Sequence, residues 1–405
     1  SDPKRAPLAP QAATGMAQAG GAASGGAGGD RQTAIRLVGV PEHFNRPVAL
    51  LQELGTPGEF EFVIQGGGTG AMLKQVKEKR VDVAIALTEG VITEVVKGDR
   101  ELAMVGLYVD APLTWSIVVG IDSPYRTLAD LEGAVVGVSR MGSGSHLMAF
   151  LLAEREGWDT TALEFETLTD FVGLRAGVND GRAGFFMWEH FTTAPFTTEK
   201  GGTELRKLGE IATPWPCFCL AMRRDTLDAE GAPQRFSSFF TKLRASCSRF
   251  KLHRRLSVRD VAAIYGLELR DAKAWLHGVH YADGPGVPRE VIVTTQAALK
   301  RLGILEHTLD AEDIIDARVT SLTDEPTMKR HTPRLSSDDE EAAAFDAEEG
   351  EERLPLDSAP AILPHIDVRN PAPGSPSSKP GYKEWRAQKQ AALHAVMAHL
   401  EGIKK

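Results

Sequence analysis

Short apolar runs and segments of helical periodicity alternate along residues 35–87. Residues 35–40 and 81–87 are runs rich in Val, Ile and Leu, and residues 60–65 alternate apolar with other positions, so all three are predicted to be strands. The intervening segments repeat apolar residues three to four positions apart, which predicts helices. Parallel strands need a crossover connection, and helices at this spacing supply it. The pattern therefore predicts an α/β fold with a parallel, doubly wound sheet.

A second series of the same kind follows. Apolar runs at residues 134–138 and 183–187 predict strands, and residues 145–156 between them have helical periodicity. Two further apolar segments, residues 113–121 and 217–222, are predicted strands that carry the chain from the first series to the second and back. We therefore expect two lobes joined by two crossings, which together form a hinge.

The two ends of the chain differ in composition from its middle. Residues 1–34 are rich in Gly and Ala, and the acidic and Pro/Ser-rich stretches after residue 335 are also predicted to be disordered. Residues 382–403 place apolar side chains at helical spacing among cations, which predicts an amphipathic helix. The expected divisions are a flexible leader (1–34), the first part of lobe 1 (35–119), lobe 2 (120–215), the return to lobe 1 with C-terminal helices (216–305), an acidic and Pro/Ser-rich linker (306–380) and the amphipathic helix (381–405).

Charge and cysteine content exclude several classes of protein. A net charge of −9 on 405 residues argues against a nucleic-acid partner, because such partners are bound through clustered Lys and Arg. No run of apolar residues is long enough to span a membrane. The three cysteines, Cys217, Cys219 and Cys247, are too few for a disulfide framework, and no second Cys/His pair completes a zinc site. We therefore expect buried thiols, no metal and no cofactor, with weak metal binding by Cys217 and Cys219 as the alternative.

The sequence does not identify the cellular compartment of the chain. Because the first residue is Ser and not Met, we interpret the chain as a processed product or a fragment, and no apolar segment typical of a signal peptide is present to be read. The cysteine usage is that of a reducing compartment. A mitochondrion, a plastid or the cytosol is therefore favoured over secretion.

Polar loops follow several of the predicted strands. In open α/β sheets a ligand lies beyond the carboxyl ends of the strands, so these loops are candidate ligand contacts. Loop 41–45 combines a carboxylate, an imidazole and an aromatic ring, and loop 66–70 offers backbone N–H groups at a helix start, where an anion is favoured. Loop 139–146 adds a guanidinium, hydroxyls and a second imidazole. Each loop also has a structural interpretation, as a turn or as a helix cap through Ser143 or Ser145.

Two more segments belong to this edge of the predicted sheets. Residues 88–90 follow a buried strand with a hydroxyl and a carboxylate, and a helix start explains them equally well. Residues 185–193 end a strand with aromatic side chains, of which Trp188 can stack on a planar ligand. Asn179 and Trp215 are lesser candidates. The candidate ligand contacts are Glu42, His43, Phe44, Gly68, Thr69, Gly70, Thr88, Glu89, Ser139, Arg140, Ser143, Ser145, His146, Trp188, Glu189 and His190.

Together these loops resemble the type 2 periplasmic-binding-protein superfamily, in particular the nitrate, sulfonate and taurine-type binding proteins and a fungal binding-protein-like group. The resemblance covers about residues 35–305 and implies a two-lobed fold that closes on a ligand bridging both lobes. It also extends to the fungal thiamine-pyrimidine synthases, which use pyridoxal phosphate, but no lysine lies in the predicted ligand loops for that cofactor. The motifs that carry it are PEHF (41–44), GGTG (67–70), LTEG (87–90), SR (139–140), GSGSH (142–146), MWEHFTT (187–193) and TPW (213–215).

Three functions remain open from the sequence. The leading hypothesis is non-catalytic binding of a small anionic or heteroaromatic metabolite between the lobes. The second is an accessory subunit of a larger assembly, docked through the leader and the C-terminal helix. The third is an enzyme in which His43, Glu42 or Glu189 acts as acid and base.

Overall fold

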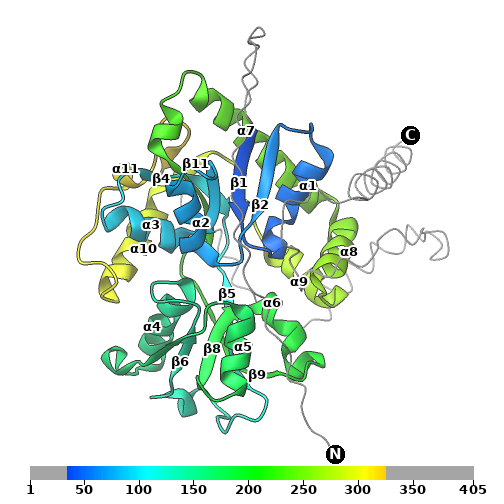
Figure 1. Cartoon of the computed structure of the whole chain (residues 1–405), viewed down its shortest axis with the longest axis vertical. Coiled ribbons are helices and arrows are strands. Elements are labelled where there is room, and N and C mark those ends of the chain that lie inside the picture. The colour runs from blue at the N-terminus through cyan, green and yellow to red at the C-terminus, as the bar shows by residue number, and fades with distance from the viewer. Residues whose placement is uncertain (1–33, 325–405) are drawn as a thin grey trace, which may run out of the picture. The chain divides into compact units, whose positions relative to one another are not determined.

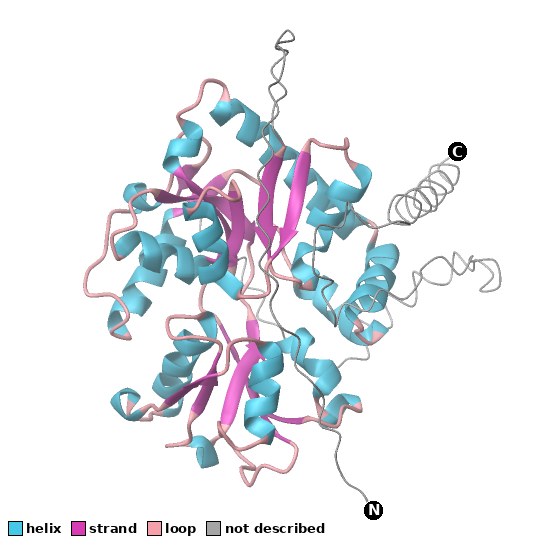
Figure 2. Ribbon diagram, in the orientation of Figure 1, coloured by secondary structure: helices cyan, strands magenta, loops and turns pink. Residues whose placement is uncertain are grey.

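The structure, a computed structural model, describes residues 34–324, and both lobes belong to one compact unit that begins at Ala34. Each lobe is built on its own five-stranded sheet with helices packed around it (Figure 1, Figure 2). A two-stranded ladder supplements the first lobe. Among the described residues, no helix combines the length and the apolar character needed to cross a membrane.

The sheet of lobe 1 has the strand order β2-β1-β3-β10-β4. β1 pairs in parallel with β2 and β3, whereas β10 is antiparallel to β3 and β4. All side chains of β4 are buried, as in a strand covered by helices on both faces, which explains its continuous apolar sequence. Its strands are β1 (Ile35–Gly39), β2 (Phe60–Ile64), β3 (Val83–Leu87), β4 (Leu102–Val109) and β10 (Phe218–Arg223).

The sheet of lobe 2 repeats this plan with the order β7-β6-β8-β5-β9. β6 is parallel to β7 and β8, and β5 is antiparallel to β8 and β9. Since β5 lies wholly in this sheet, lobe 2 begins at Thr114 and not at the expected residue 120. Its strands are β5 (Thr114–Gly120), β6 (Val136–Val138), β7 (Phe165–Thr167), β8 (Phe185–Glu189) and β9 (Leu205–Ala212).

Two crossings that run side by side connect the lobes. The backbone N–H of Leu113 donates to the Thr213 hydroxyl at 2.9 Å, and the N–H of Thr213 donates to the carbonyl of Leu113 at 3.0 Å. The Cys217 N–H donates to the Ala111 carbonyl at 2.9 Å. Paired crossings of this kind allow the lobes to rotate against each other while the sheets stay intact.

Helices cover both sheets and position the loops at the lobe boundary. Helices of lobe 1 are α1 (Arg46–Leu54), α2 (Gly68–Lys77), α3 (Thr88–Val96), α7 (Ala232–Leu252), α8 (Arg254–Tyr265), α9 (Leu269–Gly278), α10 (Arg289–Arg301) and α11 (Ala311–Ile314). Lobe 2 has α4 (Gly144–Glu156), α5 (Phe171–Asn179), α6 (His190–Thr193) and the short 3-10 helix η5 (Thr198–Lys200).

The expected linker does not start at residue 306. Residues 306–324 include α11 and strand β12 (Ser321–Thr323), which pairs in parallel with β11 (Gly286–Pro288). Ile314 and Ile315 are buried, and the N–H of Asp316 donates to the Met104 carbonyl of β4. These apolar side chains dock on lobe 1, and their burial explains why a segment of polar composition is folded.

The predicted fold class, a two-lobed type 2 periplasmic-binding-protein-like α/β fold, is confirmed. The leader, the remainder of the linker and the amphipathic helix expected at 381–405 lie outside the described residues.

Candidate ligand site between the lobes

Arg140 of lobe 2 reaches across to the start of helix α2 in lobe 1. Its Nη1 donates to the Gly67 carbonyl at 3.0 Å. The guanidinium packs so closely on the first turn of α2 that a Cβ atom at Gly70 would lie 2.8 Å from Nη2. Gly68 has a φ of +69°, a conformation that side chains rarely adopt. The glycines of loop 66–70 therefore allow the Arg140 guanidinium to approach the backbone closely, and they also form the turn.

The start of α2 and Arg140 together form an electropositive edge. The N-cap residue is Gly67, and no side chain caps the helix there. Burial lowers the pKa of Arg140, because desolvation disfavours its charge. Unpaired N–H groups at a helix start and a partly desolvated guanidinium both favour a negatively charged oxygen group.

Three glutamates lie near the lobe boundary, Glu42 and Glu89 in lobe 1 and Glu189 in lobe 2. Glu42 follows β1 and accepts a hydrogen bond from the Trp188 side chain, while burial and the charge of Glu189 raise its pKa to about 8. Glu89, in the first turn of α3, accepts from Trp215 Nε1 at 2.9 Å, and burial raises its pKa to about 7. Glu189 ends β8 and accepts from the Thr192 N–H at 2.6 Å.

His43 lies beside Glu189 and is 1% exposed. Its Nε2 is 3.7 Å from Glu189 Oε2 and has no hydrogen-bond partner. Its ring packs against Phe44 at 4.8 Å and edge-on against Trp275 at 4.6 Å, measured between centroids. Burial lowers the pKa of His43. A neutral imidazole is therefore held next to the Glu189 carboxylate with an unsatisfied ring nitrogen.

Two cysteines lie at the start of β10. Cys217 immediately precedes the strand, Cys219 lies on it, and both are buried free thiols. Burial, then the charges of Glu89, Glu189 and Glu42, raise the pKa of Cys217 well above its ordinary value, so this thiol neighbours all three carboxylates. Within residues 34–324, no group of three or more His, Cys, Asp or Glu side chains is arranged to hold a metal ion.

The serine loop of lobe 2 is held largely by its own contacts. Ser143 caps α4 by accepting from the His146 N–H at 3.3 Å, and its hydroxyl lies 2.9 Å from that of Ser145. The Ser139 N–H donates to the Ser145 hydroxyl at 3.1 Å. His146 accepts from the Gly142 N–H and packs on two phenylalanine rings of its own lobe. The capping interpretation thus accounts for Ser143, and ligand contact by this loop stays a prediction.

Three other candidate residues have structural partners, and a fourth, Thr88, is fully buried at the start of α3 with its Oγ1 unpartnered. The Phe44 ring packs on Phe218 at 5.2 Å, and the Thr69 hydroxyl accepts from the Leu87 N–H at 3.1 Å. His190 Nδ1 lies 2.9 Å from Glu210 Oε1 and 3.0 Å from the Ser116 hydroxyl. The candidates that the structure brings together across the lobes are therefore Glu42, His43, Gly68, Gly70, Glu89, Arg140, Trp188 and Glu189.

Two tryptophans at this site were not predicted from the sequence. Trp115 lies on β5, is 5% exposed and has an unpartnered Nε1; its ring faces Trp188 edge-on. Trp275 lies on α9 and contacts His43. The spacing of Trp275 within an apolar helix face is typical of core packing, so nothing in the local sequence distinguished it. We call the set of Glu42, His43, Glu89, Trp115, Arg140, Trp188 and Glu189 the interlobe site.

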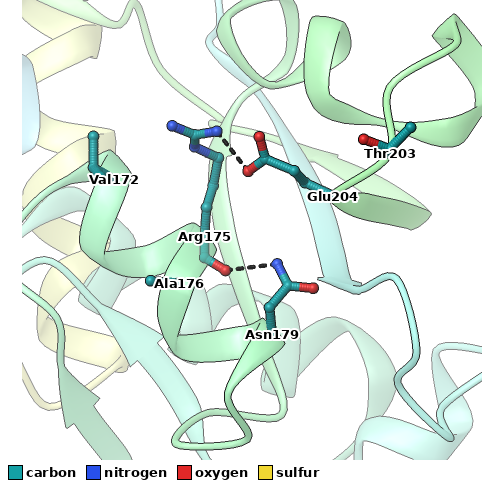
Figure 3. Close-up of a pocket in the computed structure, with 6 residues that line it drawn as sticks. All are labelled: Val172, Arg175, Ala176, Asn179, Thr203 and Glu204. Carbon is teal, nitrogen blue, oxygen red and sulfur yellow. Dashed lines mark hydrogen bonds and ion pairs between the residues drawn. The ribbon is translucent and has the colours of Figure 1, made fainter. Parts of the chain in front are cut away.

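A separate hollow of about 490 Å³ lies on lobe 2 alone, lined by α5 and the residues before β9 (Figure 3). Arg175 pairs with Glu204 at 2.6 Å and lies over the Phe196 ring at 3.8 Å, and Asn179 donates to the Arg175 carbonyl. Arg175 Nε is buried without a hydrogen-bond partner, but every residue that lines the hollow belongs to lobe 2, so the hollow does not add Asn179 to the interlobe site.

Comparison with known proteins agrees with this architecture. The family model described as Ca3427-like PBP matches residues 115–211. The CA3427 gene product of Candida albicans, described as having the generic periplasmic binding protein fold, is 26% identical with a TM-score of 0.63, over 74% of this chain and 99% of that one. A search of the curated proteins found no match.

Bacterial binding proteins share the fold at lower identity. The aliphatic sulphonate binding protein SsuA of Escherichia coli is 19% identical with a TM-score of 0.52, over 70% of this chain and 97% of that one. The alkanesulfonate-binding protein SsuA of Xanthomonas axonopodis pv. citri, bound to MOPS, is 16% identical with a TM-score of 0.55, over 73% and 100%. The chain belongs to the type 2 periplasmic-binding-protein superfamily. Within it, the chain is similar to the Ca3427-like proteins in residues 115–211.

Proposed function

We propose that the chain binds a small molecule between its two lobes and does not transform it. The observation that carries this proposal is the set of buried, unpartnered polar atoms at the interlobe site, namely His43 Nε2, Glu89 Oε1 and Trp115 Nε1. Leaving a buried polar group without a hydrogen bond costs about 1–3 kcal/mol. A ligand that satisfies groups of both lobes at once favours their closure.

Arg140 and the start of α2 favour a ligand with an acidic oxygen group. Such a group would contact the guanidinium and the first N–H groups of the helix, where the charge and the backbone dipoles add. Trp188, which is half-buried beside Glu42, offers an aromatic face for a heteroaromatic ring. The names of the bacterial relatives, which describe sulfonate binding, support an acidic ligand.

The proposal is tested by thermal unfolding with a panel of small anions, amino-sulfonates, pyrimidines, thiazoles and pyridoxal phosphate. A ligand at a hundred times its Kd stabilises the folded state by about 2.7 kcal/mol. For a folded unit of this size, residues 34–324, that corresponds to a rise of roughly 4–5 °C in melting temperature. Arg140→Ala is expected to remove the rise, because it removes the cation that joins the lobes.

Arg126→Ala provides the matched control, since Arg126 is an exposed arginine of the same lobe. It should keep the full ligand-induced rise. If no compound changes the melting temperature of the wild-type chain, or if Arg126→Ala abolishes the rise as completely as Arg140→Ala does, binding between the lobes is contradicted.

A further inference from the structure

Helices α7 and α8 carry a concentration of positive charge. Residues 232–259 contain eight Lys or Arg residues and no Asp or Glu, in a chain whose net charge is −9. Arg249, Arg254 and Arg259 are exposed, and Arg244 is half-buried. Within residues 34–324, none of these four arginines forms an ion pair with a carboxylate. A surface with this much charge of one sign favours an anionic partner. We call it the basic surface.

A hollow of about 320 Å³ lies beside the middle of α7 and is lined by this helix and by the segment that leads into β12. Arg244 belongs to its lining and donates to the Thr241 hydroxyl at 3.1 Å, and burial lowers the pKa of Arg244. The second cation of the hollow, Arg318, is paired with Asp228 and Asp316. Among the described residues, Arg244 is therefore the cation of the hollow without a counter-ion.

The complementary charge follows in the sequence, shortly after the described residues. Residues 335–352, which we call the acidic tract, contain nine Asp or Glu residues and no Lys or Arg. The tract therefore carries as much negative charge as the net excess of the whole chain, and the rest of the chain is neutral in sum. Phe345 lies in the middle of the tract, and Leu252 at the end of α7 is 72% exposed, so an apolar contact can accompany ion pairs.

The described part of the chain ends next to the basic surface. Asp324 directly follows β12, and the first residue of β12 lines the same hollow as Arg244. Asp338, the first acid of the tract, comes 14 residues after Asp324, a span that reaches at most about 45–50 Å. From Arg244 to Leu252 the helix rises by only about 12 Å. The tract can therefore reach this face of α7, and a tether this short gives an effective concentration on the order of millimolar.

We propose that the acidic tract docks on the basic surface, with carboxylates of the tract paired with Arg244 and Arg249. This inference goes beyond the proposed function, because the basic surface contains no residue of the interlobe site. An ion pair with one exposed arginine is weak, but several pairs formed by one tethered segment act together. The docked tract also keeps other polyanions away from these arginines, because like charges repel.

Energy transfer within the full chain tests this inference. Ser248→Cys, at an exposed position of α7, and Ala347→Cys, within the tract, provide sites for two dyes, and the three native thiols are buried. We expect a high transfer efficiency at low ionic strength and a lower one at 1 M salt, because salt screens exposed ion pairs. Arg244→Gln combined with Arg249→Gln should lower the ratio of docked to free tract by roughly fivefold at low ionic strength.

Arg126→Gln combined with Arg182→Gln is the matched control, since it removes two exposed arginines from lobe 2 and should leave the efficiency unchanged. Digestion by a glutamate-specific protease gives a second measurement without dyes. The α7 double variant should lose the tract roughly fivefold faster than the wild type, and the lobe 2 variant should match the wild type. Circular dichroism confirms that each variant is folded.

The outcomes separate this inference from the proposed function. If neither salt nor the α7 double variant changes the transfer efficiency and the rate of digestion, docking of the tract is wrong. It is equally wrong if transfer appears only between chains that carry one dye each, because the tract then binds a second copy of the chain. Neither measurement depends on a ligand between the lobes, so the two proposals can fail independently.

Discussion

At the scale of single residues, burial sets the charge states of the interlobe site. Burial raises the pKa of Glu89 from its ordinary value of 4.5 to about 7, because the carboxylate is removed from water and only one of its oxygens is hydrogen-bonded. The unfolded chain ionises near pH 4.5 and the folded chain near pH 7. Folding stability therefore falls as the pH rises between these values, and the loss persists above them.

We expect Glu89→Gln to stabilise the unliganded protein at pH 8 by about 3 kcal/mol and by less than about 1 kcal/mol at pH 5. Glutamine stays neutral and its side-chain oxygen still accepts from Trp215 Nε1, so the pH-dependent loss of folding stability disappears. Urea unfolding at the two pH values measures the difference. Glu61→Gln, at an exposed glutamate of β2, should follow the wild type at both, and an E89Q variant with the pH profile of the wild type would show that the Glu89 charge carries no such cost.

Several of these residues could be predicted from the sequence, and others could not. Glu42, His43 and Glu89 come soon after apolar strands. Ligands of open α/β sheets bind beyond the carboxyl ends of the strands, so these residues could be placed at that edge of the sheet. Trp275 enters from α9, about 230 residues along the chain from His43, and only the packing of the whole lobe brings the two together. Long-range contacts of this kind leave no local pattern.

At the scale of elements, the first turn of α4 approaches the end of β3 very closely. A Cβ atom at Gly144 would lie 2.6 Å from Leu87 Cδ1 and 3.1 Å from the Trp115 ring. Gly144 and Trp115 belong to lobe 2 and Leu87 to lobe 1. The glycine therefore permits a contact across the boundary that any larger side chain would obstruct.

Gly144→Leu is expected to prevent full closure and to abolish the ligand-induced rise in melting temperature. The unliganded protein should unfold within a few degrees of the wild type, because the added side chain can be accommodated when the lobes part. Gly278→Leu is the control, since Gly278 is exposed and a Cβ atom there meets no neighbour within 4 Å. If Gly144→Leu binds ligand as the wild type does, the contact between α4 and β3 does not limit closure.

Elements with strong apolar patterns were predicted well, and those with polar sequences were not. Strands β1, β3 and β6 coincide with short apolar runs, because buried strands need them. Residues 306–324 have a composition that favours a linker, yet Ile314 and Ile315 fix them on β4. Ala311, Val319 and the pairing of β12 with β11 also hold this segment, and a composition average does not reveal a few buried side chains of this kind.

At the scale of the molecule, ion pairs join the lobes on two flanks. Arg301 of α10 donates to both oxygens of Glu154 of α4, at 2.6 and 2.9 Å. Lys200 of η5 donates to Asp271 of α9 at 2.6 Å. In the view of Figure 1, α10 and α4 lie at the left of the two lobes and α9 lies at the right, so the two pairs are on opposite flanks. We call these two pairs the rim pairs, and both close only when the lobes meet.

The opening of the lobes can be followed with two dyes, because the native thiols are protected. Cys217, Cys219 and Cys247 are buried, and burial raises the pKa of each, so cysteines introduced at the surface will react first. Val172 on α5 and Val293 on α10 are 63% and 51% exposed and belong to different lobes. Val172→Cys with Val293→Cys therefore places one dye on each lobe.

In this labelled background, Glu154→Gln combined with Lys200→Gln should lower the energy-transfer efficiency of the unliganded protein. The exposed Arg301–Glu154 pair contributes about 0.2–1 kcal/mol, and loss of the Lys200–Asp271 pair leaves the buried Asp271 carboxylate without its lysine. Losing both pairs therefore shifts the open-to-closed ratio by roughly fivefold or more. Salt at 1 M should lower the efficiency of the wild type in the same direction, because it screens exposed pairs. Glu312→Gln breaks an equally short pair with Arg289 that stays inside lobe 1, and it should leave the efficiency unchanged. Equal efficiency in all variants and at both salt concentrations would mean that the buried contacts of the interlobe site, and not the rim pairs, hold the lobes together.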